Sequence, residues 1–172
     1  MLWGIRLWPS IKGLGQEVNG VINETAKVAK ALDLPTNYSD AKQDIEAAIH
    51  FIYWNNGNKP IVIVGSSYSA TLALLIAHEN EKVKAVAAFS PGEYFPAMFI
   101  QDRIQGLKKP LFVTSSKEEA AAVSLLVKEV SKNNLTHYVP HEQGIHGSRA
   151  LWESTEGCLG YWESFKAFLE QL

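Results

Sequence analysis

Short apolar runs alternate with segments of helical periodicity along this chain, and that alternation constrains the fold more than any other feature. The runs predicted to be strands lie at residues 5–8, 61–64, 83–89, 111–114 and 135–139. The segments predicted to be helices lie at residues 24–32, 41–54, 69–79, 97–105, 118–132 and 161–172. Parallel strands require crossover connections, so this order favours a mostly parallel sheet with helices on both faces. We therefore expect an α/β fold in three layers, α/β/α, with about five strands.

The composition fits one folded domain and excludes several classes of function. Hydrophobic residues make up 47% of the 172 residues, which is ample for one core, so we expect a single domain over residues 1–172. The formal charge is -2, and the 16 basic and 18 acidic residues are spread along the chain without a basic stripe for nucleic acid. The single cysteine, Cys158, excludes an internal disulfide framework and lacks the companions of a zinc site.

The apolar runs are too short for a membrane-spanning helix. The longest covers residues 72–77, whereas a helix needs ~20 apolar residues to cross a bilayer. The first ten residues carry Arg6 but have neither the longer apolar core nor the small-residue cleavage site of a signal peptide. We therefore expect the chain as given to be cytoplasmic, with no membrane partner.

The turn after the second predicted strand carries the first chemical signal. Residues 65–69 (GSSYS) are close to the G-x-S-x-G pattern of a nucleophile elbow, with Ser69 in place of the second glycine. Ser67 would stand exposed at the strand end, at a helix N-terminus and beside a backbone amide, as a nucleophile requires. Such a turn needs a small residue two positions before the serine, and Gly65 fully satisfies that need. The alternative interpretation is that Ser66 or Ser67 caps the helix, or that the turn binds an anion.

The loop after the last predicted strand carries the candidate base. It reads PHEQGIHGSRALW, and His146 lies between Gly144 and Gly147, which would let the loop bring the ring into a site. His141 is the rival, nearer the strand end but next to Pro140. The other histidines, which we expect at the surface or the edge of the core, are His50, His78 and His137.

The loop after the fourth predicted strand, SSKEEA, supplies carboxylates. Glu118 and Glu119 each fit a helix capping box, with Ser115 and Ser116 respectively, and acids are favoured in the first turn of a helix. One glutamate could cap the helix while the other orients the histidine, and spacing alone does not assign these roles. Serine, acid and histidine then follow in the chain order of α/β-hydrolases, each after the carboxyl end of a strand.

With these loops in place, the chain resembles an α/β-hydrolase and is similar to bacterial dienelactone-hydrolase-like proteins. The resembling stretches are GSSYSA, AVAAFSPGEYF, PLFVTSSKEEA and GIHGSRALW, between Lys59 and the C-terminus. The resemblance implies that Ser67 is the nucleophile, that His146 is the base and that the amide of Tyr68 is one oxyanion donor.

The resemblance also bears on the acid and on the second oxyanion donor. The family's acid follows a glycine by three residues, and Ser116 stands in that glycine's place, which points to Glu119 with Glu118 as the fallback. The second donor normally comes from a loop after an early strand that has no counterpart here, so we expect the chain to lack the N-terminal part of the fold. Losing one such donor costs about 3 kcal/mol of transition-state stabilisation.

The missing early strand has two further consequences. Our hypothesis is that the glycine-bearing segment 8–20 supplies a backbone amide in place of the second oxyanion donor. The strand at 61–64 would be left at an open sheet edge, so residues 5–8, or a second copy of the chain in a homodimer, must cover it.

The sequence therefore predicts a serine hydrolase of small carboxylic esters, lactones or thioesters, without a metal or organic cofactor. In the loop SPGEYFP, Tyr94 and Phe95 are candidate walls of a substrate pocket and Glu93 a candidate polar contact, although they fit helix packing equally well. The alternative is a catalytically weak or inactive hydrolase-fold protein that binds a small molecule or a protein. A flavodoxin-like or Rossmann-like phosphate-binding domain is disfavoured, because the glycine-rich and P-loop patterns are absent.

Overall fold

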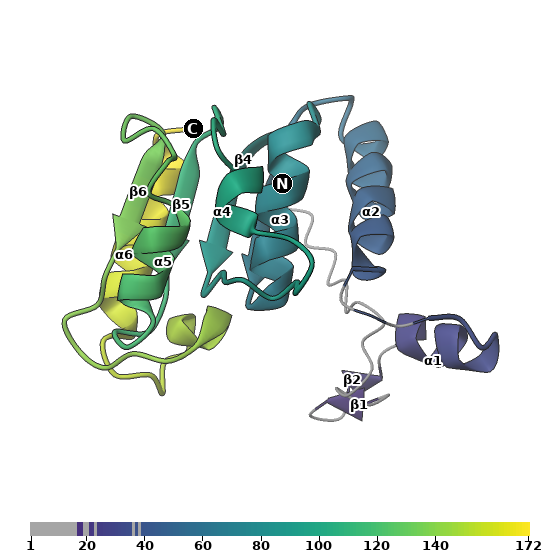
Figure 1. Ribbon diagram of the computed structural model, residues 1–172, viewed down its shortest axis with the longest axis horizontal. Coiled ribbons are helices and arrows are strands. Elements are labelled where there is room, and N and C mark those ends of the chain that lie inside the picture. Colours follow the sequence, from purple (N-terminus) through teal and green to yellow (C-terminus); the bar gives the residue numbers. More distant parts are fainter. Residues whose placement is uncertain (1–16, 19–20, 23, 36, 38) are drawn as a thin grey trace. The chain divides into compact units, whose positions relative to one another are not determined.

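A computed structural model describes residues 17–18, 21–22, 24–35, 37 and 39–172 of the chain. It divides into two compact units, Met1–Lys59 and Pro60–Leu172 (Figure 1). The expectation of one domain over the whole chain stays a prediction. The strand predicted at residues 5–8 and most of the segment 8–20 lie outside the described residues.

The first unit contains two short strands and two helices. Strands β1 (Glu17–Val18) and β2 (Val21–Ile22) pair antiparallel. They are followed by helix α1 (Glu24–Ala31) and helix α2 (Ala41–Asn55), which match the predicted helices to within one residue at each end.

The second unit is built on a parallel sheet. Its strands, in the spatial order β3-β4-β5-β6, are β3 (Ile61–Ser66), β4 (Val83–Phe89), β5 (Leu111–Thr114) and β6 (Leu135–Tyr138). All three neighbouring pairs are parallel. The described residues thus give four strands where we expected about five, and the fifth candidate falls among the residues that are not described.

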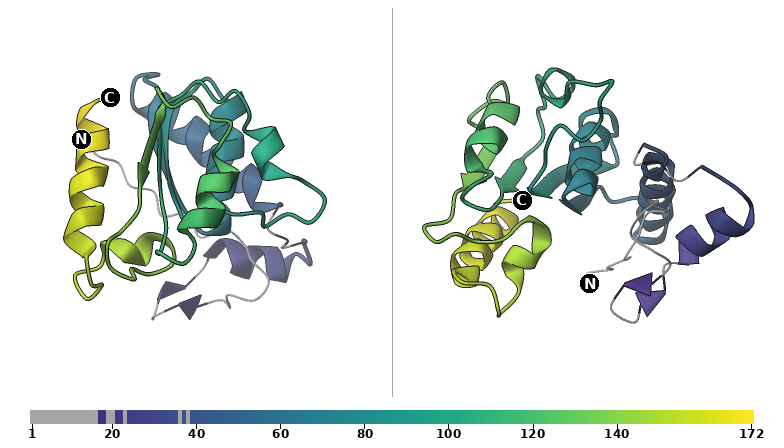
Figure 2. Two further views of the ribbon diagram at one scale, coloured as in Figure 1. Left: turned by 60° about the vertical axis from the view of Figure 1, so that its left-hand side comes forward. Right: turned by 60° about the horizontal axis from the view of Figure 1, so that its bottom comes forward.

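Helices cover both faces of this sheet, which confirms the predicted three-layer α/β/α architecture. Figure 2 shows α3 (Tyr68–Glu79), α4 (Ile100–Arg103) and α5 (Ala120–Leu126) on one face, with α6 (Cys158–Glu170) on the other. A short 3-10 helix, η1 (Gly147–Leu151), precedes α6. None of the described helices is long and apolar enough to cross a membrane.

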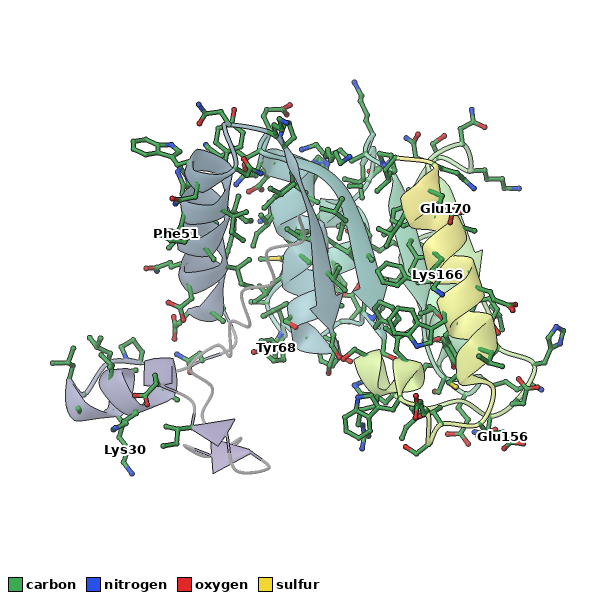
Figure 3. All side chains as sticks on the ribbon, turned by 180° about the vertical axis from the view of Figure 1, so that it is seen from behind. Lys30, Phe51, Tyr68, Glu156, Lys166 and Glu170 are labelled. Carbon is green, nitrogen blue, oxygen red and sulfur yellow. The ribbon has the colours of Figure 1, made fainter. Side chains whose placement is uncertain are left out.

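The core explains why these segments form these elements. Strand β4 is buried at every position except Lys84, as expected for the continuous apolar run of an inner parallel strand. On the far face, α6 presents Phe165 and Phe168 to the sheet, and the ring of Phe165 lies 5.5 Å from that of Phe89. Figure 3 shows α6 running along the sheet, with Lys166 and Glu170 labelled on it. Burying each such aromatic side chain contributes about 1.5–3 kcal/mol.

Two helices are shorter than predicted. Helix α4 begins at Ile100 rather than at residue 97, because the carboxylate of Glu93 accepts the backbone amides of Ile100 (2.7 Å) and Gln101 (3.1 Å). Helix α5 begins at Ala120 rather than at residue 118, because the side chain of Glu119 folds back onto the preceding turn, and it ends at Leu126 rather than at residue 132.

The register of the sheet aligns the carboxyl ends of its strands. Ser66 pairs with Phe89, Phe89 with Thr114, and Thr114 with Tyr138. These four residues form one row across the sheet, and each is the last residue of its strand. The four loops that follow them therefore start side by side at one edge.

Candidate active site

Ser67 lies in a sharp turn between β3 and α3. Its backbone has φ 59° and ψ -134°, a region that non-glycine residues rarely adopt. Tyr68 begins α3, where the first amide groups of a helix have no carbonyl partner within it. Figure 3 labels Tyr68 at the end of α3 nearest the arrowhead of β3.

The turn is tight because of Gly65 and Ser69. A Cβ on Gly65 would lie 2.5 Å from the backbone of both Ala70 and Ser69, so only glycine fits there. The hydroxyl of Ser69 donates to the carbonyl of Ser66 at 2.7 Å and accepts from its amide at 3.2 Å. Ser69 therefore closes the turn with two hydrogen bonds from the position of the motif's second glycine.

Glu119 and His146 form a pair. His146 Nδ1 lies 2.5 Å from Glu119 Oε1, and both side chains are about a third exposed, at 40% and 31%. The second carboxylate oxygen, Oε2, accepts hydrogen bonds from the hydroxyls of Ser90 (2.7 Å) and Ser116 (2.9 Å) and from the amide of Ser116 (3.1 Å). One carboxylate therefore contacts the histidine and caps the turn before α5.

These hydrogen bonds set the charge state of the acid. Burial by itself raises the pKa of Glu119, but the hydrogen bonds from His146, Ser90 and Ser116 outweigh it and lower the pKa below its ordinary value of 4.5. Glu119 is consequently ionised near neutral pH and can only accept hydrogen bonds. A neutral His146 bonded to it then carries its proton on Nδ1, and Nε2 can accept a proton.

The segment that follows His146 is fixed to the ends of two strands. The amide of Gly147 donates to the hydroxyl of Ser90, and the amide of Ser148 donates to the hydroxyl of Ser66, both at 2.9 Å. Because Ser66 immediately precedes Ser67, the histidine loop is held next to the turn that carries Ser67.

The loop that carries His146 also packs closely against α6. Gly144 has φ 64°, and a Cβ there would collide with the hydroxyl of Tyr161. That hydroxyl donates to the carbonyl of Ser115 at 2.9 Å. Burial, with Tyr138 and Glu119 nearby, raises the pKa of Tyr161 to about 12. Tyr161 is therefore a neutral, fully buried support for the loops that carry the acid and the histidine.

The hydroxyl of Ser67 points to the loop after β4. Its partner among the described residues is Tyr94 Oη at 3.4 Å, not His146. Tyr94 Oη in turn donates to the carbonyl of Ser90 at 3.1 Å. Tyr94 and Phe95 are half-buried, while both carboxylate oxygens of Glu93 are engaged by amides of α4.

The other candidates lie apart from the pair. Glu118 is exposed, and so is His141, whose carbonyl accepts from Lys117. His137 lies in β6, its Nε2 is buried without a hydrogen-bond partner among the described residues, and burial lowers its pKa. The remaining histidines lie on helices: His50 on α2 and His78 on α3.

Sequence reasoning did not single out Ser66 as a loop anchor, and it did not single out Ser90 at all. Each is a serine at or next to a strand end, and no spacing rule assigns a distant partner to such a residue. The available signal for Ser90 is its place as the first polar residue after the apolar run of β4. Ser90 is 1% exposed and adopts φ 53°, so its conformation is imposed by its surroundings.

No metal site is evident beside the pair among the described residues. Within the described part of the chain, no group of three or more His, Cys, Asp or Glu residues could hold a metal ion. A hollow occurs in the first unit, between α1 and the start of α2, and it contains none of the predicted site residues.

The chain matches the family model described as "Dienelactone hydrolase family" over residues 15–147. Among solved structures, it is similar to the Pyrococcus furiosus esterase Pf2001, with 17% identity and a TM-score of 0.60 over 76% of this chain and 62% of that one. It is also similar to the esterase domain of a Rhodothermus marinus protein, with 17% identity and a TM-score of 0.54 over 72% of this chain and 68% of that one. At this identity the likeness concerns the fold. No curated protein matches the sequence significantly.

Proposed function

The chain belongs to the dienelactone hydrolase family, and we propose that it hydrolyses small carboxylic esters, lactones or thioesters by a serine mechanism. The observation that carries this proposal is the Glu119–His146 pair, whose loop is hydrogen-bonded to the residue before Ser67. A serine in a strained strand-to-helix turn beside such a pair is the arrangement of nucleophilic acyl transfer.

In the proposed reaction, Ser67 Oγ attacks the carbonyl carbon while His146 Nε2 takes its proton. The tetrahedral intermediate collapses with cleavage of the bond to the leaving group, which receives that proton from His146. Water then adds to the acyl-enzyme, again with His146 as base, and releases the acid and Ser67. Glu119 keeps the proton of neutral His146 on Nδ1, and the Tyr68 amide stabilises the oxyanion.

The Ser67 hydroxyl must change partner for this reaction. It faces Tyr94 at 3.4 Å, which is long for a hydrogen bond between hydroxyls, so little free energy holds it there. Rotation of the side chain towards His146 on substrate binding completes the relay, and catalytic hydrogen bonds commonly tighten at that stage. Tyr94 and Phe95 would then line the acyl side of the pocket.

The contact between Ser67 and Tyr94 also supports a second candidate function, a hydrolase-fold binding protein with little turnover. In that case Tyr94 keeps the Ser67 hydroxyl away from His146, and the loops serve to bind a small molecule. The two candidates differ in whether Ser67 reacts covalently.

Covalent labelling tests the proposal. We expect a fluorophosphonate to label the wild-type protein and p-nitrophenyl acetate to be hydrolysed, with both activities lost in Ser67→Ala and His146→Ala. His141→Ala, which removes the exposed rival, is the matched control and should keep both activities. Labelling that persists in Ser67→Ala would reject Ser67 as nucleophile, and a folded wild type that is neither labelled nor active would favour the binding protein.

A further inference from the structure

Two serine hydroxyls hold consecutive amides of the histidine loop. Ser90 accepts from Gly147 and Ser66 accepts from Ser148, each at 2.9 Å. Gly147 is buried with φ 73°, and a Cβ there would lie 2.6 Å from the hydroxyl of Ser66. The loop therefore approaches both strand ends as closely as its backbone allows.

Ser90 differs from Ser66 because its hydroxyl also contacts the acid. Ser90 Oγ donates to Glu119 Oε2 at 2.7 Å while it accepts from the Gly147 amide. An amide can only donate and an ionised carboxylate can only accept, so the direction of both hydrogen bonds is fixed. Ser90 thus joins the acid to the residue after the histidine through one oxygen atom.

The backbone of Ser90 is held as firmly as its side chain. Its amide donates to the carbonyl of Thr114 at 2.7 Å, and its carbonyl accepts from Tyr94 Oη at 3.1 Å. A positive φ is unfavourable for a non-glycine residue, and these contacts must offset that strain. This backbone conformation places the Ser90 hydroxyl between the loop that carries Glu119 and the loop that carries His146.

We infer that Ser90 is a positioning residue that sets the mutual orientation of Glu119 and His146 for proton transfer. The inference rests on the proposed function. Ser90 fixes one oxygen of Glu119 while the other faces His146, and it fixes the loop that carries His146 at the same time. Ser116 holds only the acid and Ser66 holds only the loop, so Ser90 alone of these three couples the two.

Removal of the hydroxyl should therefore affect kcat more than KM. For Ser90→Ala we expect kcat to fall about 10- to 100-fold, the range for losing a hydrogen bond to a charged group, with KM changed by less than about 3-fold. Ser116→Ala and Ser66→Ala should each reduce kcat less, because each breaks only one side of the connection. Ser124→Ala, on the exposed face of α5, is the neutral control.

The pH profile separates positioning from general damage. The titratable groups that face Glu119 are His146, from the loop before η1, and Tyr161, from α6. Loss of the Ser90 donor raises the pKa of Glu119, so the acidic limb of kcat/KM, which reports the coupled pair, should move to higher pH. A merely structural role would lower activity without moving this limb.

A double-mutant cycle completes the test, with p-nitrophenyl acetate as substrate and the full chain as enzyme. If Ser90 acts through the acid, Ser90→Ala should reduce kcat by a clearly smaller factor in a Glu119→Gln background than in the wild type. Ser90→Gly removes the same hydroxyl and relieves the left-handed strain, so it should reproduce the loss of kcat even if Ser90→Ala folds poorly.

The outcomes separate this inference from the proposed function. An active wild type whose Ser90→Ala and Ser90→Gly variants keep kcat overturns the role of Ser90 and leaves the proposed function standing. Equal losses from Ser90→Ala in the wild-type and Glu119→Gln backgrounds overturn it as well. A folded wild type without activity contradicts both.

Discussion

Glu119 and His146 lie on loops that follow two neighbouring strands, β5 and β6, and their side chains meet at 2.5 Å. The same carboxylate accepts the amide and hydroxyl of Ser116 through its other oxygen. The sequence allows one glutamate to cap the helix while the other orients the histidine, and spacing does not assign these roles to Glu118 or Glu119. One residue performs both because a carboxylate has two oxygens, each able to accept more than one hydrogen bond.

Replacement of Glu119 by glutamine should nearly abolish turnover. Glutamine keeps the shape but can present an amide group to His146 Nδ1, which favours the wrong tautomer. We expect kcat of p-nitrophenyl acetate hydrolysis to fall on the order of 10³-fold or more. Glu118→Gln, at the exposed neighbouring position, should stay within about 2-fold of wild type, since exposed substitutions away from such contacts have small effects. A comparable loss in both variants would contradict the assignment of Glu119.

The lowered pKa of Glu119 predicts a loss of stability in acid. A group whose pKa is depressed in the folded state stabilises it above the unfolded pKa, and this contribution disappears as pH falls through the folded pKa. The free energy of unfolding should therefore decrease as pH drops below about 4.5, measured by urea denaturation. Glu119→Gln should show a shallower decrease over that range. An unchanged slope in the variant would mean that Glu119 ionises alike in both states.

The inner strands could be predicted from the sequence almost residue by residue. β4 and β5 have the bounds expected from the apolar runs at 83–89 and 111–114. Strands buried in a parallel sheet read as unbroken apolar segments, so the signal is strong. The start of α4 could not be predicted, because it depends on Glu93, seven residues earlier in the chain, whose side chain accepts the amide of Ile100.

The candidate site was predictable only in part, for a related reason. Ser67, Glu119 and His146 each follow the end of a strand, and parallel strands bring such loops together. The serines that join these loops carry no local pattern. Ser90 meets Gly147, 57 positions away, only because the register places Phe89 beside both Ser66 and Thr114.

Gly65→Ala should severely destabilise the protein. Its Cβ would lie 2.5 Å from backbone atoms of Ser69 and Ala70, which cannot move without opening the turn between β3 and α3. We expect a loss of more than about 3 kcal/mol in chemical denaturation, typical of strong overpacking. Gly106→Ala is the matched control: nothing lies within 4 Å of its Cβ, so it bears only the left-handed strain of about 1 kcal/mol. Gly65 does not have a positive φ, so a loss no larger than that of Gly106→Ala would contradict the claim that lack of space decides position 65.

Ser69 stands where the motif has its second glycine. The hydrogen bonds of its hydroxyl predict that it contributes to the stability of the protein. Two hydrogen bonds join it to the backbone of Ser66, directly before the nucleophile candidate. Ser69→Ala keeps the Cβ and should lower the free energy of unfolding by about 1–3 kcal/mol, the sum for two such bonds. Ser69→Gly restores the common motif but loses the same bonds and adds backbone freedom, so it should be no more stable than Ser69→Ala. If Ser69→Gly instead has the same thermal stability as the wild type, the hydroxyl does not stabilise this turn, and serine is only compatible with a position where the motif has glycine.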